Sequence, residues 1–321
     1  MTKAHSDAPG SPAPGPGALA RPYLVLLLAP LFWSGNTIAS KLAVGHIEPL
    51  TLTATRWITA FLLVLPFAWP HLRRDWKMIR PKLWLLLGYG AFGMSLFNVL
   101  LYSAPHFTSA VNMSIEQAAI PVLVMVGNFA IFRVRARLLQ IVGVALTLWG
   151  VLLVATHGAP ELALSLSINQ GDALMLGACL AYAVYSLTLR YRPDIHWLSF
   201  LVAIFAGAAL ASILFQLALS GPASILDAPQ TIDMQGWLIV AYTAIFASIV
   251  AQLCYAVSVS RVGPNRASLF INLIPVFGTL MSIALLGERF EPYHLIASGF
   301  VIVGIALAEW TSAGRPEITA A

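Results

Sequence analysis

Three charged residues stand inside long apolar stretches of this 321-residue sequence: Lys41, Arg56 and Glu116. A charge at the centre of a membrane helix costs about 2.5–3.5 kcal/mol on insertion scales, so such residues persist when they are paired or face water. Glu116 continues a polar pattern with Ser109 and Asn112 at helical spacing, which puts the three side chains on one helix face. We expect that face to line an aqueous cavity.

Each of these charges has two interpretations. Glu116 could carry a proton in exchange for a transported solute, or it could form a structural ion pair with Arg56 or Lys41. Arg56 could pair with a carboxylate or with helix carbonyls, or its planar guanidinium could anchor a substrate carboxylate through two parallel hydrogen bonds. Lys41 lies about one turn from a span end, where a lysine usually extends its amine to the lipid headgroups.

Amide and aromatic side chains recur in the middle of the apolar stretches, where they need partners and can stack on a planar solute. Polar stripes also join membrane helices, and aromatic residues also form belts at the membrane surface, so each residue alone has a structural alternative. The candidate substrate-binding residues are Trp33, Asn36, Arg56, Tyr89, Asn112, Glu116, Tyr182, Tyr185, Gln252 and Asn272. The candidate hinges are Pro121 and Pro275, since proline kinks a helix and frees a carbonyl.

The elements that must position these residues are membrane helices. The chain is 59% hydrophobic and only 10% charged, whereas a soluble domain has about 25% charged residues. A helix needs about 20 apolar residues to cross the hydrocarbon. The apolar stretches predict an all-α membrane protein with ten transmembrane helices at 23–43, 49–69, 83–104, 109–132, 138–156, 171–190, 197–219, 236–259, 265–286 and 293–312.

The basic residues predict the orientation of these spans. Cytoplasmic loops of membrane proteins carry an excess of lysine and arginine. With the N-terminus inside, the only basic residue outside is Arg289, and Lys41 and Arg56 lie within spans. The remaining basic residues all fall on the inside: Lys3, Arg21, Arg73, Arg74, Lys77, Arg80, Lys82, Arg133, Arg135, Arg137, Arg190, Arg192, Arg261, Arg266 and Arg315. We therefore expect both termini to be cytoplasmic.

The sequence indicates an internal repeat. A shift of 154 positions aligns Pro121 with Pro275 and Gly150 with Gly304; the alternative is that proline and glycine recur by chance in membrane helices. Five helices per copy is an odd number, so the copies cross the membrane in opposite directions, as in many secondary transporters. The predicted domains are a disordered cytoplasmic tail (1–22, rich in Pro, Gly and Ala), the first five-helix repeat (23–156), an external connection (157–170), the second repeat (171–312) and a cytoplasmic tail (313–321).

Motifs of other protein classes are missing from the sequence. It contains no GxxxxGK[ST] loop for nucleotide-driven work and no HExxH or GxSxG motif of a hydrolase. Both cysteines lie in apolar stretches, and the seven histidines lie mainly in the tail and loops, where we expect solvated surface. We expect no enzyme, no cofactor, no metal and no nucleic-acid partner.

Several short motifs follow one another along the chain: Phe32-Trp33-Ser34-Gly35-Asn36, Pro49, Arg56, Pro121, Gly171-Asp172, Pro275, Gly287-Glu288 and Gly304. In this order and spacing they resemble the EamA family of the drug/metabolite transporter superfamily. The family implies two inverted five-helix repeats and export of small metabolites, often amino acids. Within it, the chain is similar to aromatic amino-acid exporters. One departure is that Gly287-Glu288 has no counterpart after Phe132, where Arg133 and Val134 follow.

These observations predict a secondary transporter of the bacterial inner membrane. It would export small organic metabolites, most simply amino acids, by alternating access through a central cavity. Its expected partners are a small-molecule substrate and the lipid bilayer, and we expect a monomer to be sufficient for transport. Coupling to protons and simple equilibration of the solute both stay open. The alternatives are an exporter of drugs or organic cations that binds its cation at Glu116, a membrane-embedded enzyme that acts on lipids, and a scaffold or receptor.

Overall fold

The computed structural model describes residues 16–133, 137–159, 169–223, 230–262, 267 and 270–310, and every regular element in these ranges is helical. The first helix begins at Pro16, so the predicted tail is shorter than 1–22. The rest of that tail, the tail at 313–321 and most of the 157–170 connection lie outside the described residues. The helices are α1 (Pro16–Leu42), α2 (Pro49–Ile79), η1 (Arg80–Lys82), α3 (Leu83–Tyr89), η2 (Gly90–Leu96), α4 (Phe97–Ser103), η3 (Ala104–His106), α5 (Ala110–Glu116), α6 (Ala119–Phe132), α7 (Leu138–Ala155), α8 (Gln170–Thr188), η5 (Leu189–Tyr191), α9 (Trp197–Ser220), α11 (Met234–Tyr242), η6 (Thr243–Val250), α12 (Ala251–Val262), α14 (Ile274–Leu286) and α15 (Pro292–Trp310).

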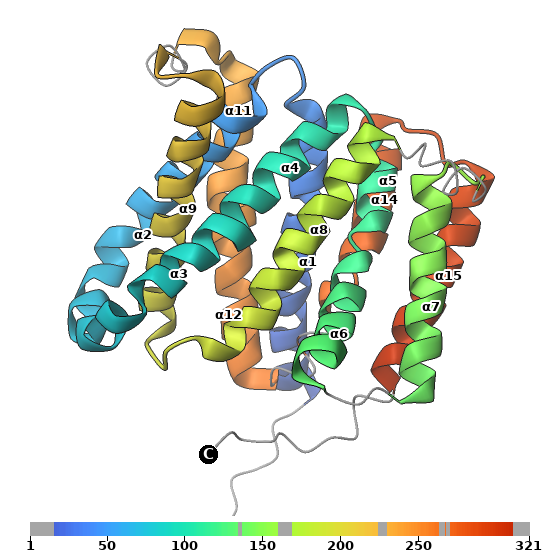
Figure 1. Ribbon diagram of the computed structural model, residues 1–321, viewed down its shortest axis with the longest axis horizontal. Helices are drawn as coiled ribbons and strands as arrows, with labels where there is room; N and C mark the ends of the chain where they lie inside the picture. The colour runs from blue at the N-terminus through green and yellow to red at the C-terminus, as the bar shows by residue number, and fades with distance from the viewer. Residues whose placement is uncertain are drawn as a thin grey trace, which may run out of the picture.

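Seven helical stretches in the described residues are long and apolar enough to cross a membrane, and two shorter apolar helices, Ile274–Leu286 and Pro292–Leu307, accompany them. One of the seven, Pro49–His106, is 58 residues long. It contains two of the predicted spans, because α2 runs down and α3 and α4 return upward in Figure 1. The count of ten spans and the side of each terminus remain predictions.

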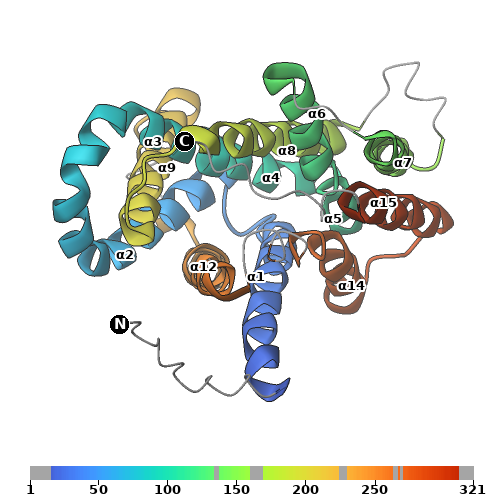
Figure 2. The same cartoon turned by 90° about the horizontal axis from the view of Figure 1, so that it is seen from below.

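The helices lie side by side as a bundle in which α1 is central (Figures 1 and 2). α1 packs against α12 and α14, and α4 and α6 both pack against α8. α7 pairs with α15 at one end of the bundle, and α2 pairs with α9 at the other. Each outer pair joins a helix of the first half of the chain to one of the second half.

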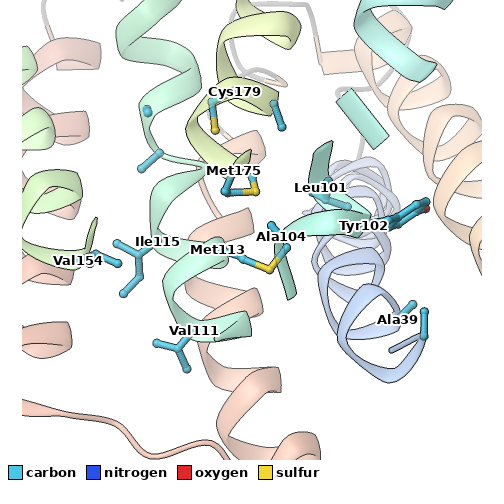
Figure 3. Close-up of a cluster of buried hydrophobic side chains, with 14 of the residues drawn as sticks. Ala39, Leu101, Tyr102, Ala104, Val111, Met113, Ile115, Val154, Met175 and Cys179 are labelled. Carbon is cyan, nitrogen blue, oxygen red and sulfur yellow. The ribbon is translucent and has the colours of Figure 1, made fainter. Parts of the chain in front are cut away.

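Two apolar clusters hold this bundle together. One lies between α2, α3 and α9 and contains Trp57 and Phe205, whose ring centroids are 5.1 Å apart. The other surrounds α5: Figure 3 shows Ile115 beside Val154 of α7, and Met113 beside Met175 of α8. Lipid tails are as apolar as leucine, so close packing rather than the hydrophobic effect drives helix association in a bilayer. Gly150 and Gly304 supply that closeness between α7 and α15, because a methyl group added at either would lie within 3 Å of a backbone carbonyl oxygen of the other helix.

Several helices are interrupted inside a predicted span. Gly90–Leu96 (η2) and Thr243–Val250 (η6) form π-helices, and the two segments are 153 to 154 positions apart, as the repeat requires. The predicted span 109–132 is divided at Gln117 and Ala118 into α5 and α6. Pro121 and Pro275 each lie within the first three residues of the helix that begins after an interruption, where proline is tolerated. They therefore do not kink a continuous helix; each stands where a helix restarts.

The helix ends also correspond between the two halves. α6 ends at Arg133 with φ 53°, and α14 ends at Gly287 with φ 65°, both in the left-handed region. These positions are 154 residues apart. The sequence motif differs at this corner, but the backbone conformation is the same.

The start of α5 carries a cap from the other half of the chain. The carboxylate of Glu288 accepts hydrogen bonds from the backbone N–H groups of Ala110 and Val111, each at 2.9 Å. The hydroxyl of Ser109 accepts a third, from the N–H of Asn112 at 3.0 Å. The first N–H groups of a helix have no partner within it, so these acceptors satisfy them.

Candidate substrate-binding site

Arg56 is the centre of a buried polar network. Its side chain is only 4% exposed. Nε donates to the hydroxyl of Ser248 at 2.8 Å, and Nη1 donates to the amide oxygens of Asn36 at 2.9 Å and Asn98 at 2.8 Å. Nη1 also donates to the hydroxyl of Tyr102, which itself donates to Asn36 Oδ1 at 2.8 Å. We call these five residues the Arg56 centre.

The Arg56 centre is built from both halves of the chain. Asn36 comes from α1, Arg56 from α2, and Asn98 and Tyr102 from α4, whereas Ser248 comes from η6. The π-helix positions Ser248, because its hydroxyl donates to the carbonyl five residues earlier, at Thr243, at 2.9 Å. Asn98 is the second residue of α4, which begins directly after the other π-helix, η2. Both irregular segments therefore deliver a partner to the same guanidinium.

Aromatic rings from α1, α3, α8 and α12 form further contacts between helices. Tyr185 packs edge-on against both Tyr89, at 5.7 Å between centroids, and Tyr182, at 5.3 Å. Tyr89 also donates a hydrogen bond to the carbonyl of Thr188. Trp33 of α1 lies 5.7 Å from Tyr255 of α12, and both rings are half-buried. Ring contacts again join residues of the first half of the chain to residues of the second.

A second polar network surrounds Asn112 on α5. Its Oδ1 faces Nε2 of His294 at 2.9 Å, and its Nδ2 donates to the hydroxyl of Thr108 at 3.3 Å. That hydroxyl in turn donates to the carboxylate of Asp172, which is fully buried. His294 is also buried, at 2% exposure, so the expectation of a solvated histidine is wrong at this position.

Glu116 lies beside this network without a polar partner. The residue is fully buried, and neither carboxylate oxygen has a hydrogen bond within the described residues. Arg56 makes the bonds given above, and the amine of Lys41 donates to the carbonyls of Pro105 and Thr108 at 2.8 and 2.9 Å. The ion-pair interpretation of Glu116 therefore finds no support. Lys41 therefore joins α1 to the connection between α4 and α5, and its amine does not extend toward the lipid headgroups.

The remaining two candidates, Gln252 on α12 and Asn272 before α14, are half-buried. The structure thus brings Asn36 to Arg56, groups Tyr89 with Tyr182 and Tyr185, and gives Asn112 partners of its own. The residues that sequence reasoning left out of the candidate set are Asn98, Tyr102, Thr108, Asp172, Ser248 and His294. Asn98 and Ser248 stand at polar positions well inside predicted spans and could have been found by that signal, whereas Tyr102 lies near the end of the predicted span 83–104. Thr108 and His294 lie at span ends and carry no such signal.

Comparisons with known proteins agree on one family. The model of the EamA-like transporter family matches residues 20–156 and 169–310, that is, once in each half of the chain. The uncharacterized transporter YyaM of Bacillus subtilis (strain 168) is 27% identical over 290 residues, which cover 89% of this chain and 92% of that protein. A probable amino-acid metabolite efflux pump of Salmonella typhimurium (strain LT2) is 28% identical over 296 residues, covering 88% of this chain and 92% of the pump.

Two further similarities concern location and fold. The uncharacterized inner membrane transporter YedA of Escherichia coli (strain K12) is 25% identical over 300 residues and covers 91% of this chain and 89% of its own length. A solved crystal structure superimposes with a TM-score of 0.60 over 92% of this chain and 98% of that chain, at 19% identity. The names of these relatives point to transporters rather than to enzymes.

Proposed function

Because the chain belongs to the EamA-like transporter family and is a multi-pass protein of the bacterial inner membrane, we propose that it exports small organic metabolites, foremost amino acids, by alternating access. The observation that carries this proposal is that polar and aromatic contacts cross between the two matched halves. Arg56 bonds to Ser248, Tyr89 packs on Tyr185, and Trp33 lies against Tyr255. Substrate sites of repeat-built transporters lie at such a junction.

The arrangement we propose has ten spans in two oppositely inserted halves, 23–156 and 171–312, with both termini in the cytoplasm. Two matches to one family model support the duplication, as do the paired π-helices and the paired left-handed helix ends. The excess of basic residues on one side of the predicted spans supports the orientation.

Alternating access requires one end of the bundle to be closed while the other is looser. All seven residues of α5 are buried, as is every residue from Ser34 to Ser40 in the second half of α1. In α6, which continues from α5 toward the other end, only Ala119 and Val122 are buried. This difference in burial supports a form closed at the α5 end. The helix restarts near Pro121 and Pro275 are the hinges that we propose for the exchange between forms.

A specific observation favours a second candidate, an exporter of drugs or organic cations. Glu116 is a buried carboxylate without a polar partner in the described part of the chain, and a cation could supply one. The proton-carrier interpretation of Glu116 rests on the same observation. Both therefore belong in the same experiment.

The test is a flux screen with the full chain in proteoliposomes. We expect counterflow of one or more labelled amino acids and no flux of lipophilic cations such as tetraphenylphosphonium. Flux of the cation without flux of any amino acid would favour the second candidate. Absence of flux for amino acids, related metabolites and cations alike would contradict transport, and product formation from labelled lipid would then test the enzyme alternative.

A further inference from the structure

Arg56 is a buried cation without a counter-ion. Ion pairs in the described residues join only His46 to Asp233 and Arg74 to Asp75. The acceptors around Arg56 are two amides and two hydroxyls, all of them neutral. Removing a charge from water is expensive, and neutral dipoles recover only part of that cost. The centre therefore carries an uncompensated positive charge in the interior of the bundle.

One nitrogen of the guanidinium, Nη2, has no hydrogen-bond partner in the described residues and keeps some accessible surface. Nε and Nη1 carry all its hydrogen bonds, and Nη1 has three acceptors for only two N–H groups. Nη2 has two N–H groups and no acceptor among the described residues. Yet Nη2 is not among the fully enclosed polar atoms that lack a partner, a set that includes Trp57 Nε1 and Ser95 Oγ. An acceptor from solution can therefore approach Nη2.

The surroundings select the kind of acceptor. Cζ of Arg56 lies 4.6 Å from the centre of the Trp57 ring, so the indole shields one side of the guanidinium. A parallel pair of N–H groups, one from Nη2 and one from Nε or Nη1, matches the two oxygens of a carboxylate. No second cation assists, because Lys41, the other basic residue within a predicted span, is held by two backbone carbonyls. One positive charge suits a singly charged anion better than a phosphate.

We propose that the guanidinium of Arg56 binds the carboxylate of the transported solute, which makes the substrates monocarboxylates such as amino acids. This inference rests on the transport function proposed above and narrows its substrate class. A bound carboxylate competes for N–H groups that now hold Asn36, Asn98 and Ser248. Because these residues belong to α1, α4 and η6, binding of the solute changes the contacts between the two halves of the chain.

The first experiment needs no variant. Proteoliposomes holding the full chain are screened for flux with the labelled panel of amino acids, and each transported compound is then challenged with three unlabelled analogues. One analogue lacks the amine, one carries an amide in place of the carboxylate, and one lacks the carboxylate. We expect the acid without the amine to compete, and the two analogues without a carboxylate to be at least about tenfold weaker, as loss of a charged hydrogen bond implies. Equal competition by the amide would overturn the proposal even though transport is present.

The second experiment replaces the guanidinium. Arg56→Lys keeps the charge but loses the fork, and we expect KM for the amino acid to rise about ten- to hundredfold. In Arg56→Gln the preference for the acid over its amide should fall to near one. Lys77→Gln, which removes an exposed charge from the same helix, is the matched control and should leave both quantities unchanged. An Arg56→Gln protein that folds and still prefers the acid would refute the role of Arg56. Absence of flux for the whole panel in the unaltered protein would instead refute transport, and this inference with it.

Discussion

Replacing Gly90 by alanine should separate α9 from the π-helix that it packs against. A methyl group added at Gly90 would lie 2.1 Å from the carbonyl oxygen of Ile204 and 2.4 Å from the backbone nitrogen of Ala208. Ordinary contact begins near 3.4 Å, so the two backbones must move apart by about 1.3 Å. Neither obstacle is a flexible side chain. Such overpacking typically costs about 1–3 kcal/mol.

Gly88→Ala is the matched control for this change, because nothing lies within 4 Å of a methyl group there. Both variants gain the helix preference of alanine over glycine, about 1 kcal/mol, so their difference isolates the cost of the clash. We expect Gly90→Ala to have a free energy of unfolding about 1–3 kcal/mol below that of Gly88→Ala, measured by circular dichroism during reversible unfolding in mixed detergent micelles. Gly207→Ala, which meets Leu87 from the opposite side of the same contact, should resemble Gly90→Ala. Equal stability of the Gly90 and Gly88 variants within about 0.5 kcal/mol would show that this close contact does not exist.

Three further predictions concern the helix ends and Glu116. Glu288→Gln weakens the cap on α5, so the free energy of unfolding should fall by about 1–3 kcal/mol. The control is Glu291→Gln, in the same connection, which should leave the free energy of unfolding unchanged. Equal losses in the two variants would contradict the cap. Gly287→Ala should lower the free energy of unfolding by about 1–2 kcal/mol, because alanine is strained in the left-handed conformation. Arg133→Gly, at the corresponding left-handed position, should leave the free energy of unfolding unchanged or raise it. A lower free energy of unfolding in both variants would argue against backbone strain at these positions. If Glu116 carries a proton, Glu116→Gln should abolish the dependence of flux on an imposed pH gradient. Exchange of solute between compartments of equal pH should continue in this variant. A variant whose flux still depends on the pH gradient would exclude the role of proton carrier.

The positions of most helices could be read from the sequence. The stretch predicted at 138–156 forms α7 (Leu138–Ala155), and the one at 197–219 forms α9 (Trp197–Ser220). The predicted and observed helices agree because the thickness of the bilayer fixes the length of a membrane helix and polar residues mark its ends. The length of an apolar stretch and the polar residues at its ends can both be read from a sequence. The interruptions were not predicted. A π-turn and the break before α6 depend on which neighbours satisfy the displaced backbone groups, and those neighbours are distant in the chain.

The candidate site could be predicted residue by residue but not as a set of contacts. Mid-span position alone identified Asn36 and Arg56, which bond to each other across 20 positions of sequence. It could not reveal that Glu116 would stand apart from Arg56, since helical periodicity fixes the face of one helix and not the rotation of its neighbours. His294 was missed for the opposite reason. Its place beside a loop suggested exposure, but α15 turns it into the interior, where it meets Asn112.

The paired π-helices have a consequence for how the chain tolerates insertion and deletion. A π-turn holds one residue more than an α-turn, so deleting a residue from Thr243–Val250 would restore regular helix and remove the geometry in which the Ser248 hydroxyl reaches the carbonyl of Thr243. Ser248 could then no longer face Arg56. A deletion in Gly90–Leu96 would likewise remove the π-helix that precedes α4, the helix on which Asn98 stands. A single inserted residue, gained before the ancestral gene duplicated, would account for both π-helices. Each copy would then have had to keep its extra residue to preserve its contact with Arg56.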